Sequence, residues 1–186
     1  MKKLLGILVL GLFLITPSQA DDIQDFQIEG MSIRDSLLNY MSEEEIKESI
    51  IYIYPDKKFT VSKYKKFTKL YDGGINVEYR SKDKTYKIYG VVGVMNFNNN
   101  IESCYKKQDE IEKDISSMFK KSKIKKFGIA PSWQGNESTY KQTQFYVASG
   151  DALSVDCYNF PNNPKTNHLK VTITSKELQK YLMSLE

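Results

Sequence analysis

Two cysteines and one histidine are the residues of this sequence with the most distinctive chemistry. Cys104 and Cys157 belong to no Cys-x-x-Cys motif, and His168 is the only histidine. A structural zinc site takes four Cys, His or carboxylate ligands at close spacing, so the sequence predicts no metal site and no reactive thiol. In an oxidising compartment an even number of cysteines predicts pairing, and we expect a Cys104–Cys157 disulfide.

Candidate catalytic groups are few. A Ser-His-Asp or Cys-His site would have to use His168, which falls in a loop before an expected strand. Glycoside hydrolysis uses two carboxylates, and Asp151 and Asp156 flank an expected strand. Whether they could act as such a pair depends on their separation in space, which the sequence does not show. We assign no catalytic residue. We also assign no cofactor, because the sequence has neither βαβ alternation nor a glycine-rich phosphate loop.

The only tryptophan, Trp133, lies in the segment Pro-Ser-Trp-Gln-Gly-Asn, whose composition is typical of a loop. Binding residues are often carried by loops on a rigid scaffold, and an indole beside amide side chains stacks on a sugar or on a partner's side chain. Trp133, Gln134 and Asn136 are therefore candidate ligand-binding residues. The alternative is that Trp133 fills the core beneath the loop.

The first 20 residues have the organisation of a secretory signal peptide. Met-Lys-Lys precedes 12 apolar residues at positions 4–15, and Ser-Gln-Ala at 18–20 gives the small-x-small pattern that signal peptidase reads. The apolar run is shorter than the about 20 residues of a spanning helix. We predict cleavage before Asp21, which leaves residues 21–186 as one periplasmic or secreted domain with no transmembrane segment.

The mature domain is nearly neutral, since removal of the signal peptide with its two lysines leaves 25 basic and 23 acidic residues. Lysines still gather at 63–66 and 120–126, which keeps open a polyanion such as lipopolysaccharide as partner. Only Arg34 and Arg80 are arginines, whereas phosphate-binding surfaces favour the bidentate guanidinium. We therefore expect the lysines to form a solvated face, and nucleic acid is disfavoured as a partner.

Local patterns place these residues on helices and antiparallel hairpins. The capping boxes Ser32–Asp35 and Ser42–Glu45 predict two short helices in tandem. A long helix from about Asn99 carries Cys104 on its apolar stripe, a closing helix begins near residue 175, and residues 127–140 are expected to be a loop. Apolar and alternating runs predict six strands, at 59–64, 75–80, 86–97, 142–148, 153–160 and 169–174.

The predicted fold class is α+β, because helices and antiparallel strands are segregated along the chain. We expect an antiparallel sheet of five or six strands with an N-terminal pair of short helices. One long helix packs on the sheet and is clamped to it by the disulfide, and a short C-terminal helix closes the domain.

Several segments resemble a family of uncharacterised exported proteins of marine alphaproteobacteria. The first are Ile-Glu-Gly-Met-Ser-Ile-x-Asp-Ser-Leu-Leu at 28–38 and Met-Ser-Glu-Glu-Glu-Ile at 41–46. Cys-x-x-Lys-x-Asp-Glu-Ile at 104–111 and Val-Asp-Cys at 155–157 are similar to the same family. The resemblance covers most of the mature chain and implies export, and it brings no known activity.

These features predict an exported, non-catalytic domain that binds a protein partner or an envelope component such as a polysaccharide. The alternative is a small exported hydrolase that uses carboxylates. A deep pocket lined by acids with raised pKa values would favour the hydrolase. A shallow surface with an open sheet edge would favour the binding domain.

Overall fold

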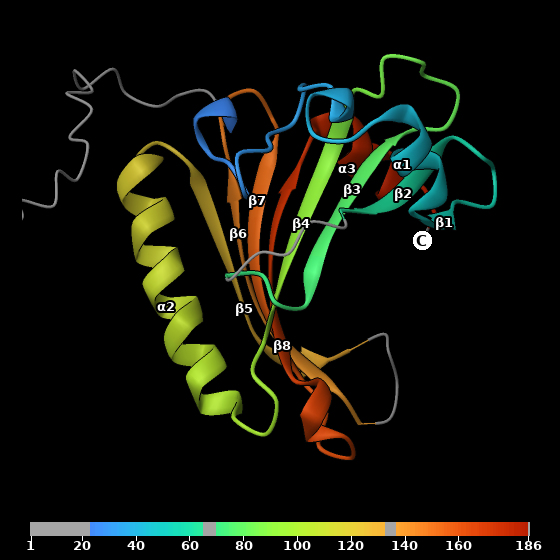
Figure 1. Cartoon of the computed structure of the whole chain (residues 1–186). Helices are drawn as coiled ribbons and strands as arrows, with labels where there is room; N and C mark the ends of the chain where they lie inside the picture. Colours follow the sequence, from blue (N-terminus) through green and yellow to red (C-terminus); the bar gives the residue numbers. More distant parts are fainter. Residues whose placement is uncertain (1–22, 65–69, 133–136, 186) are drawn as a thin grey trace, which may run out of the picture.

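The structure, a computed structural model, describes residues 23–64, 70–132 and 137–185 (Figure 1). Eight strands in this part of the chain form one antiparallel sheet, in the order β1-β2-β3-β4-β8-β7-β6-β5. The helices are α1 (Glu43–Glu48), α2 (Ile101–Met118) and α3 (Lys176–Met183). The strands are β1 (Ile50–Ile53), β2 (Phe59–Tyr64), β3 (Gly74–Arg80), β4 (Ile88–Asn96), β5 (Lys123–Pro131), β6 (Thr139–Tyr146), β7 (Ala152–Asn159) and β8 (His168–Thr174).

The predicted fold class, an α+β domain with five or six strands, is wrong. The described chain is dominated by a single sheet of eight strands, and the two strands that the sequence did not predict, β1 and β5, are its two edges. β5 takes up part of the expected loop 127–140, and β1 begins at Ile50, directly after the short helix α1. Nearly every residue of both strands is exposed, so they lack the alternation that identifies a half-buried strand.

The first of the two predicted N-terminal helices does not form. Ser32 N donates to Asp35 Oδ2 at 3.0 Å, as in a capping box, but Arg34 between them has a φ of 75° that a right-handed helix does not allow. The backbone pairs with the sheet instead, since Arg34 N donates to Ile88 O and Ile88 N donates to Asp35 O, both at 2.8 Å. A short 3₁₀ turn, Leu37–Asn39, follows, and α1 then begins at its expected capping box.

One face of the sheet, here called the inner face, carries the main core. Alternate residues of β7 and β8 are buried on it: Leu153, Val155, Cys157, Leu169, Val171 and Ile173. α2 packs over β7 and β8, while the N-terminal segment lies over the neighbouring half of the sheet (Figure 1). The inner face is therefore closed by the long helix on one side and by the N-terminal segment on the other.

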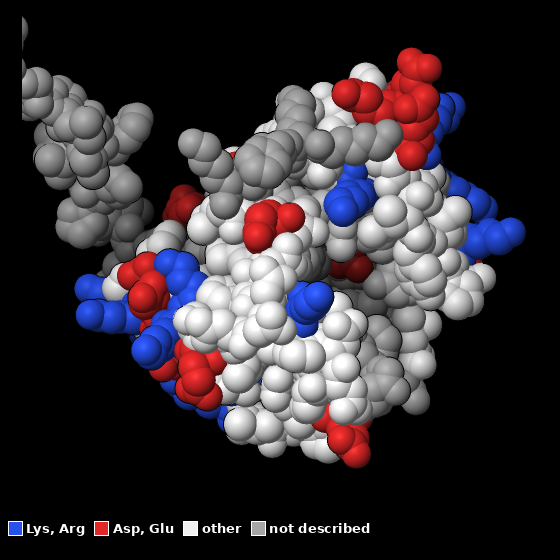
Figure 2. All heavy atoms as spheres, turned by 60° about the horizontal axis from the view of Figure 1, so that its bottom comes forward, with Lys and Arg blue, Asp and Glu red and all other residues white. Residues whose placement is uncertain are grey.

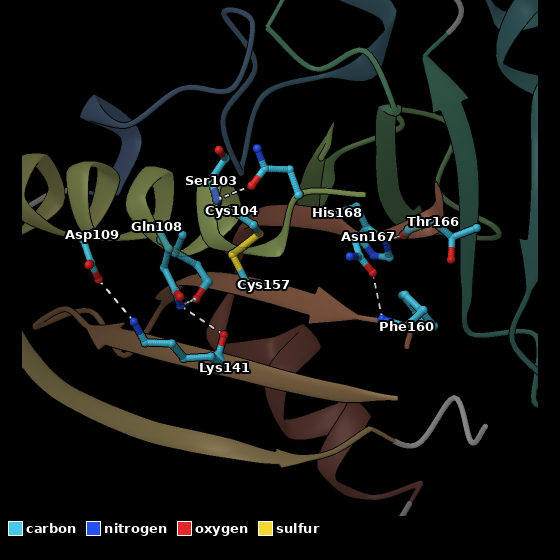
Figure 3. Close-up of a disulfide and its surroundings, with 12 residues drawn as sticks. Ser103, Cys104, Gln108, Asp109, Lys141, Cys157, Phe160, Thr166, Asn167 and His168 are labelled. Carbon is cyan, nitrogen blue, oxygen red and sulfur yellow. Dashed lines mark hydrogen bonds and ion pairs between the residues drawn. A yellow bond between two sulfur atoms is a disulfide. The ribbon is translucent and has the colours of Figure 1, made fainter. Parts of the chain in front are cut away.

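Cys104 of α2 and Cys157 of β7 form the predicted disulfide, with their Cα atoms 6.0 Å apart (Figure 3). Cys157 lies on the inner face together with Val155, as their shared alternation predicts. One helical turn after Cys104, Gln108 Nε2 donates to the backbone oxygens of Lys141 at 3.0 Å and Val155 at 2.9 Å. The disulfide and this amide together fix α2 across β6 and β7.

The opposite face, here called the outer face, is covered at one end by α3. Leu178 and Tyr181 of α3 pack with Phe59 of β2. A Cβ at Gly90 of β4 would lie 2.8 Å from Leu178 Cδ2 and 2.4 Å from Glu78 Oε2, so this close approach depends on a glycine. Over β6, β7 and β8, most outer side chains remain only partly buried.

Candidate functional site on the outer face

Polar side chains cover the outer face of β6, β7 and β8. Because side chains alternate along a strand, the burial of Val155 and Cys157 beneath α2 turns Ser154 and Asp156 to the other side. The register places Gln142 of β6 and Lys170 of β8 on either side of Asp156. We call this surface the polar panel, and its members are Gln142, Gln144, Tyr146, Ser154, Asp156 and Lys170.

A chain of hydrogen bonds follows β6 toward Asp156. Tyr146 Oη donates to Gln144 Oε1, and Gln144 Nε2 donates to Gln142 Oε1 at 2.8 Å. The Gln142 amide in turn interacts with the Asp156 carboxylate, and Ser154 Oγ donates to Asp156 Oδ2 at 2.9 Å. The carboxylate is therefore the terminal acceptor of the chain.

Asp156 is buried but incompletely satisfied. Its side chain belongs to a residue that is 4% exposed, and among the described residues Oδ1 has no hydrogen-bond partner. Burial raises the pKa of Asp156 to about 6, because it outweighs the opposing effects of Ser154, Gln142 and Lys170. An unpaired buried acceptor costs about 1–3 kcal/mol, so such a group calls for an explanation. Asp156 Oδ1 is thus a covered acceptor that no described side chain of the panel satisfies.

Lys170 balances the charge of Asp156 from the next strand. Its Nζ lies over the ring of Tyr158, 4.4 Å from the ring centre. Burial lowers the pKa of Lys170, and the charge of Asp156 opposes that shift only in part. The middle of the panel thus carries one acid and one base and is close to neutral as a whole.

A row of near-parallel rings borders the panel. Ring centres are 5.9 Å apart for Tyr140 and Tyr158, 5.0 Å for Tyr158 and His168, and 5.6 Å for His168 and Phe160. The cross-strand register of β6, β7 and β8 aligns the first three of these side chains. The row gives the panel a stiff aromatic border at one end.

A hollow of about 220 Å³ adjoins the panel where α3 meets β6 and β7. Gln144, Tyr146 and Ser154 line it on the sheet side, and Leu182 and Met183 line it on the α3 side. Figure 2 shows a different side of the molecule, the one nearer the start of α2, where charged side chains gather over α2 and at the far right. A wall of amides and hydroxyls facing an apolar wall suits an uncharged polar ligand.

The predicted ligand-binding residues Trp133, Gln134 and Asn136 lie outside the described residues. His168, the only candidate for a histidine base, stands within the row of rings with its Nδ1 2.7 Å from Thr166 O. Burial lowers its pKa, so the ring is held neutral at neutral pH. His168 therefore lies packed between the rings of Tyr158 and Phe160.

Asp151 and Asp156, the carboxylates that flank a strand in the sequence, do not face one another. Asp151 Oδ2 accepts from Arg34 Nη2 and from Ser149 Oγ, each at 2.6 Å. Its Oδ1 accepts from the backbone N of Lys176 at 2.8 Å. Both oxygens of Asp151 are thus engaged in holding segments together.

A second acid with a raised pKa, Glu78, lies far from Asp156. Burial raises the pKa of Glu78 as it does that of Asp156. In the register, Glu78 pairs with Gly90, Gly90 with Thr174 and Thr174 with Ala152, which lies four residues before Asp156. Three strand spacings and four residues correspond to roughly 15–20 Å. The two carboxyl groups of glycosidases are about 5–9.5 Å apart, so Glu78 and Asp156 do not form such a pair.

The lysine run at 120–126 is divided between the two faces of the sheet. Lys126 Nζ pairs with Glu112 Oε2 of α2 at 2.6 Å, on the inner side. Lys125 lies over the ring of Tyr146 at 5.3 Å, on the outer side. Because neighbouring positions of β5 point in opposite directions, the run does not form one continuous cationic surface.

Sequence reasoning missed the polar panel, although two patterns mark it. Gln-x-Gln-x-Tyr at 142–146 and Ser-x-Asp-x-Tyr at 154–158 put polar side chains at alternate positions of two paired strands. Such alternation predicts a face turned away from the core. The alternation does not reveal that Lys170 lies beside Asp156. That contact depends on the order of strands in the sheet, in which β8 is the neighbour of β7.

In the part of the chain that the structure describes, no group of three or more His, Cys, Asp or Glu residues is placed to hold a metal ion. No helix of that part is long and apolar enough to cross a membrane. No protein-family model matches the chain, and no curated protein is found to be similar to it. The resemblance to the exported family therefore stays a prediction.

Proposed function

We propose that this chain is an exported binding domain that holds a hydroxyl-rich ligand, an oligosaccharide of the cell envelope, on the polar panel. The observation that carries the proposal is the buried Oδ1 of Asp156, an acceptor without a partner among the described residues at the end of a hydrogen-bond chain. A ligand hydroxyl that displaced the side chains covering this oxygen and donated to it would remove an unfavourable unpaired group.

The chemistry of the panel favours an uncharged polyol over an anion. The amides of Gln142 and Gln144 and the hydroxyls of Tyr146 and Ser154 both donate and accept hydrogen bonds, as sugar hydroxyls do. One acid and one base at the centre leave little net field to attract a phosphate or sulfate. The adjoining hollow adds an apolar wall against which the less polar face of a sugar ring packs.

Two observations support the exported part of the proposal. The first 20 residues carry the charged start, apolar run and small-x-small ending of a signal peptide. The buried Cys104–Cys157 bond belongs to a class of cross-link that is rare in reducing compartments. The hydrolase alternative has less support, because the acids with raised pKa values lie three strands apart.

The proposal is tested by screening the purified protein on an array of bacterial envelope oligosaccharides and measuring affinities by titration calorimetry. Gln144→Ala and Asp156→Ala remove panel groups and should each weaken binding by about 10- to 100-fold, the loss expected for hydrogen bonds that involve a charged group or its relay. Asn76→Ala is the matched control, since Asn76 is an outer-face amide on β3 and should leave the affinity unchanged.

Two results would contradict this function. One is binding that both panel variants leave intact. The other is affinity that collapses as ionic strength rises, because screening of exposed charges would then identify lysines as the binding groups.

A further inference from the structure

The edge strand β1 has an unusual surface for an unpaired edge. Its four residues, Ile-Ile-Tyr-Ile, are all exposed, with Ile51 54% and Ile53 49% accessible. Natural proteins protect such edges with short strands, β-bulges, lysines, prolines or a covering segment, and β1 is short, with a register shift between Ile50 and Tyr52. β1 contains neither lysine nor proline, and a run of exposed apolar residues of this kind marks an interaction surface.

The opposite edge, β5, is exposed along nearly its whole length but differs in charge. Ile124 and Ile129 are 43% and 64% accessible, and lysines stand between and before the apolar residues. The lysines of this edge and its approach are Lys120, Lys121, Lys123, Lys125 and Lys126. β5 therefore combines apolar side chains with a strongly positive flank.

The surroundings of the two edges have opposite charge. Residues 42–58, which contain β1, hold five acids and three lysines, and the acids of α1 are exposed. Residues 119–131, which contain β5, hold five lysines and no acid. Like charges placed opposite one another across a strand pair are destabilising. Pairing of β5 with β5 would place lysines opposite lysines and is thus disfavoured. β1 has no charged residue of its own, but pairing of β1 with β5 brings the acids of α1, which precede β1, near the lysines of the partner, and this favours that pairing.

We infer that β1 of one molecule pairs with β5 of a second copy, so that the sheet continues from one molecule into the next. The backbone groups at each edge supply the hydrogen bonds, and the exposed isoleucines of both strands bury one another. β1 has four residues with a register shift between Ile50 and Tyr52, and β5 offers five regular positions before its own register shift after Phe127, so the contact is limited to a short stretch of both strands. The contact joins two different surfaces, so it extends into a chain of molecules.

The β1–β5 contact between two molecules should be weak, because it buries little surface. Pairing of four residues buries much less than the about 1,000 Å² of a specific stable interface. Association should therefore appear at concentrations on the order of 0.1–1 mM. Because the inference uses the sheet edges alone, it stands or falls separately from ligand binding at the polar panel.

Cross-linking of cysteine variants tests the pairing directly. No free cysteine is present among the described residues, so Ile51→Cys on β1 and Ile124→Cys on β5 introduce unique thiols while the native disulfide stays intact. The two variants, carrying different tags, are mixed and treated with a short bismaleimide. We expect the mixed Ile51→Cys with Ile124→Cys product to form at least about tenfold faster than either homodimer, since this product alone brings the acids of α1 near the lysines of β5.

The control mixes Ile51→Cys with Ser117→Cys, an exposed position on α2. Equal rates in the test and control mixtures would overturn the inference, and so would faster formation of the Ile51→Cys homodimer, which would indicate a two-fold β1–β1 contact.

Sedimentation velocity on the unmodified chain gives a second, independent measurement. We expect association that weakens as salt is raised from 0.05 to about 1 M, where the Debye length falls to about 3 Å. Ile51→Lys adds a protecting lysine to an exposed position and should abolish association while leaving the melting temperature unchanged. Association that persists in Ile51→Lys would place the contact elsewhere.

Discussion

Asp156 shows how one residue can be retained at the expense of stability. Its carboxyl group has a pKa of about 6 in the folded protein, well above the value of about 3.9 for an unperturbed aspartate. A group of this kind stabilises the fold below the unfolded pKa, where it is neutral in both states. That contribution is lost as the pH rises through the folded pKa, because the buried group must then ionise. A residue that disfavours folding at neutral pH fits a role in binding.

The first prediction at this scale concerns Asp156→Asn. The amide has the same shape and never ionises, so at pH 7 the variant should be more stable than the unmodified protein by about 2–3 kcal/mol. Between pH 4 and 6 the unmodified protein should lose stability as the pH rises, and the variant should not. Urea denaturation at a series of pH values measures both, with the exposed Asp114→Asn as control. Parallel pH profiles for Asp156→Asn and the unmodified protein would show that burial does not govern this carboxyl group.

At the scale of elements, the alternation of apolar and polar residues predicts strands that have one buried face. It does not predict strands that have no buried face. The six expected strands lie within three residues of β2, β3, β4, β6, β7 and β8. β5 was predicted as a solvated lysine run followed by a loop, because it is exposed on both faces, and β1 is too short to show a period. The sequence also marks the outward residues of β6 and β7 but cannot show which strand lies beside them. Candidate sites on a sheet therefore depend on strand order, which long-range packing decides.

The disulfide carries a prediction for the elements that it joins. Cys104 and Cys157 are separated by 53 residues, for which the chain-entropy model gives roughly 4 kcal/mol, a figure that measured bridges often do not reach. The double change Cys104→Ser and Cys157→Ser should lower the free energy of unfolding by about 2–4 kcal/mol. Hydrogen exchange should show the loss of protection concentrated in α2 and β7, because the disulfide is the covalent link between these two elements. A uniform loss of protection would mean that α2 does not open separately from the sheet.

At the scale of the whole molecule, one carboxylate joins three parts of the chain that are distant in sequence. Asp151, in the turn before β7, accepts from Arg34 of the N-terminal segment and from the backbone N of Lys176 at the start of α3. The residue is 3% exposed. The segment that covers the inner face and the helix that covers the outer face are thus tied to the same turn, so the two layers are linked around the end of the sheet.

The last prediction follows from this link. Asp151→Ala removes an acceptor from both partners, and breaking a buried ion pair costs about 3–5 kcal/mol. The Arg34 side chain is 36% exposed, so solvent screening reduces the contribution of the Arg34–Asp151 pair to stability. We expect Asp151→Ala to lower the free energy of unfolding by about 2–4 kcal/mol in total. Asp151→Asn keeps an oxygen for Lys176 N and should lose about half as much. A double-mutant cycle with Arg34→Ala, measured by denaturant unfolding, should give a coupling of about 1–2 kcal/mol. A coupling near zero would mean that Asp151 acts through α3 alone and that the N-terminal segment is held by its backbone bonds to β4.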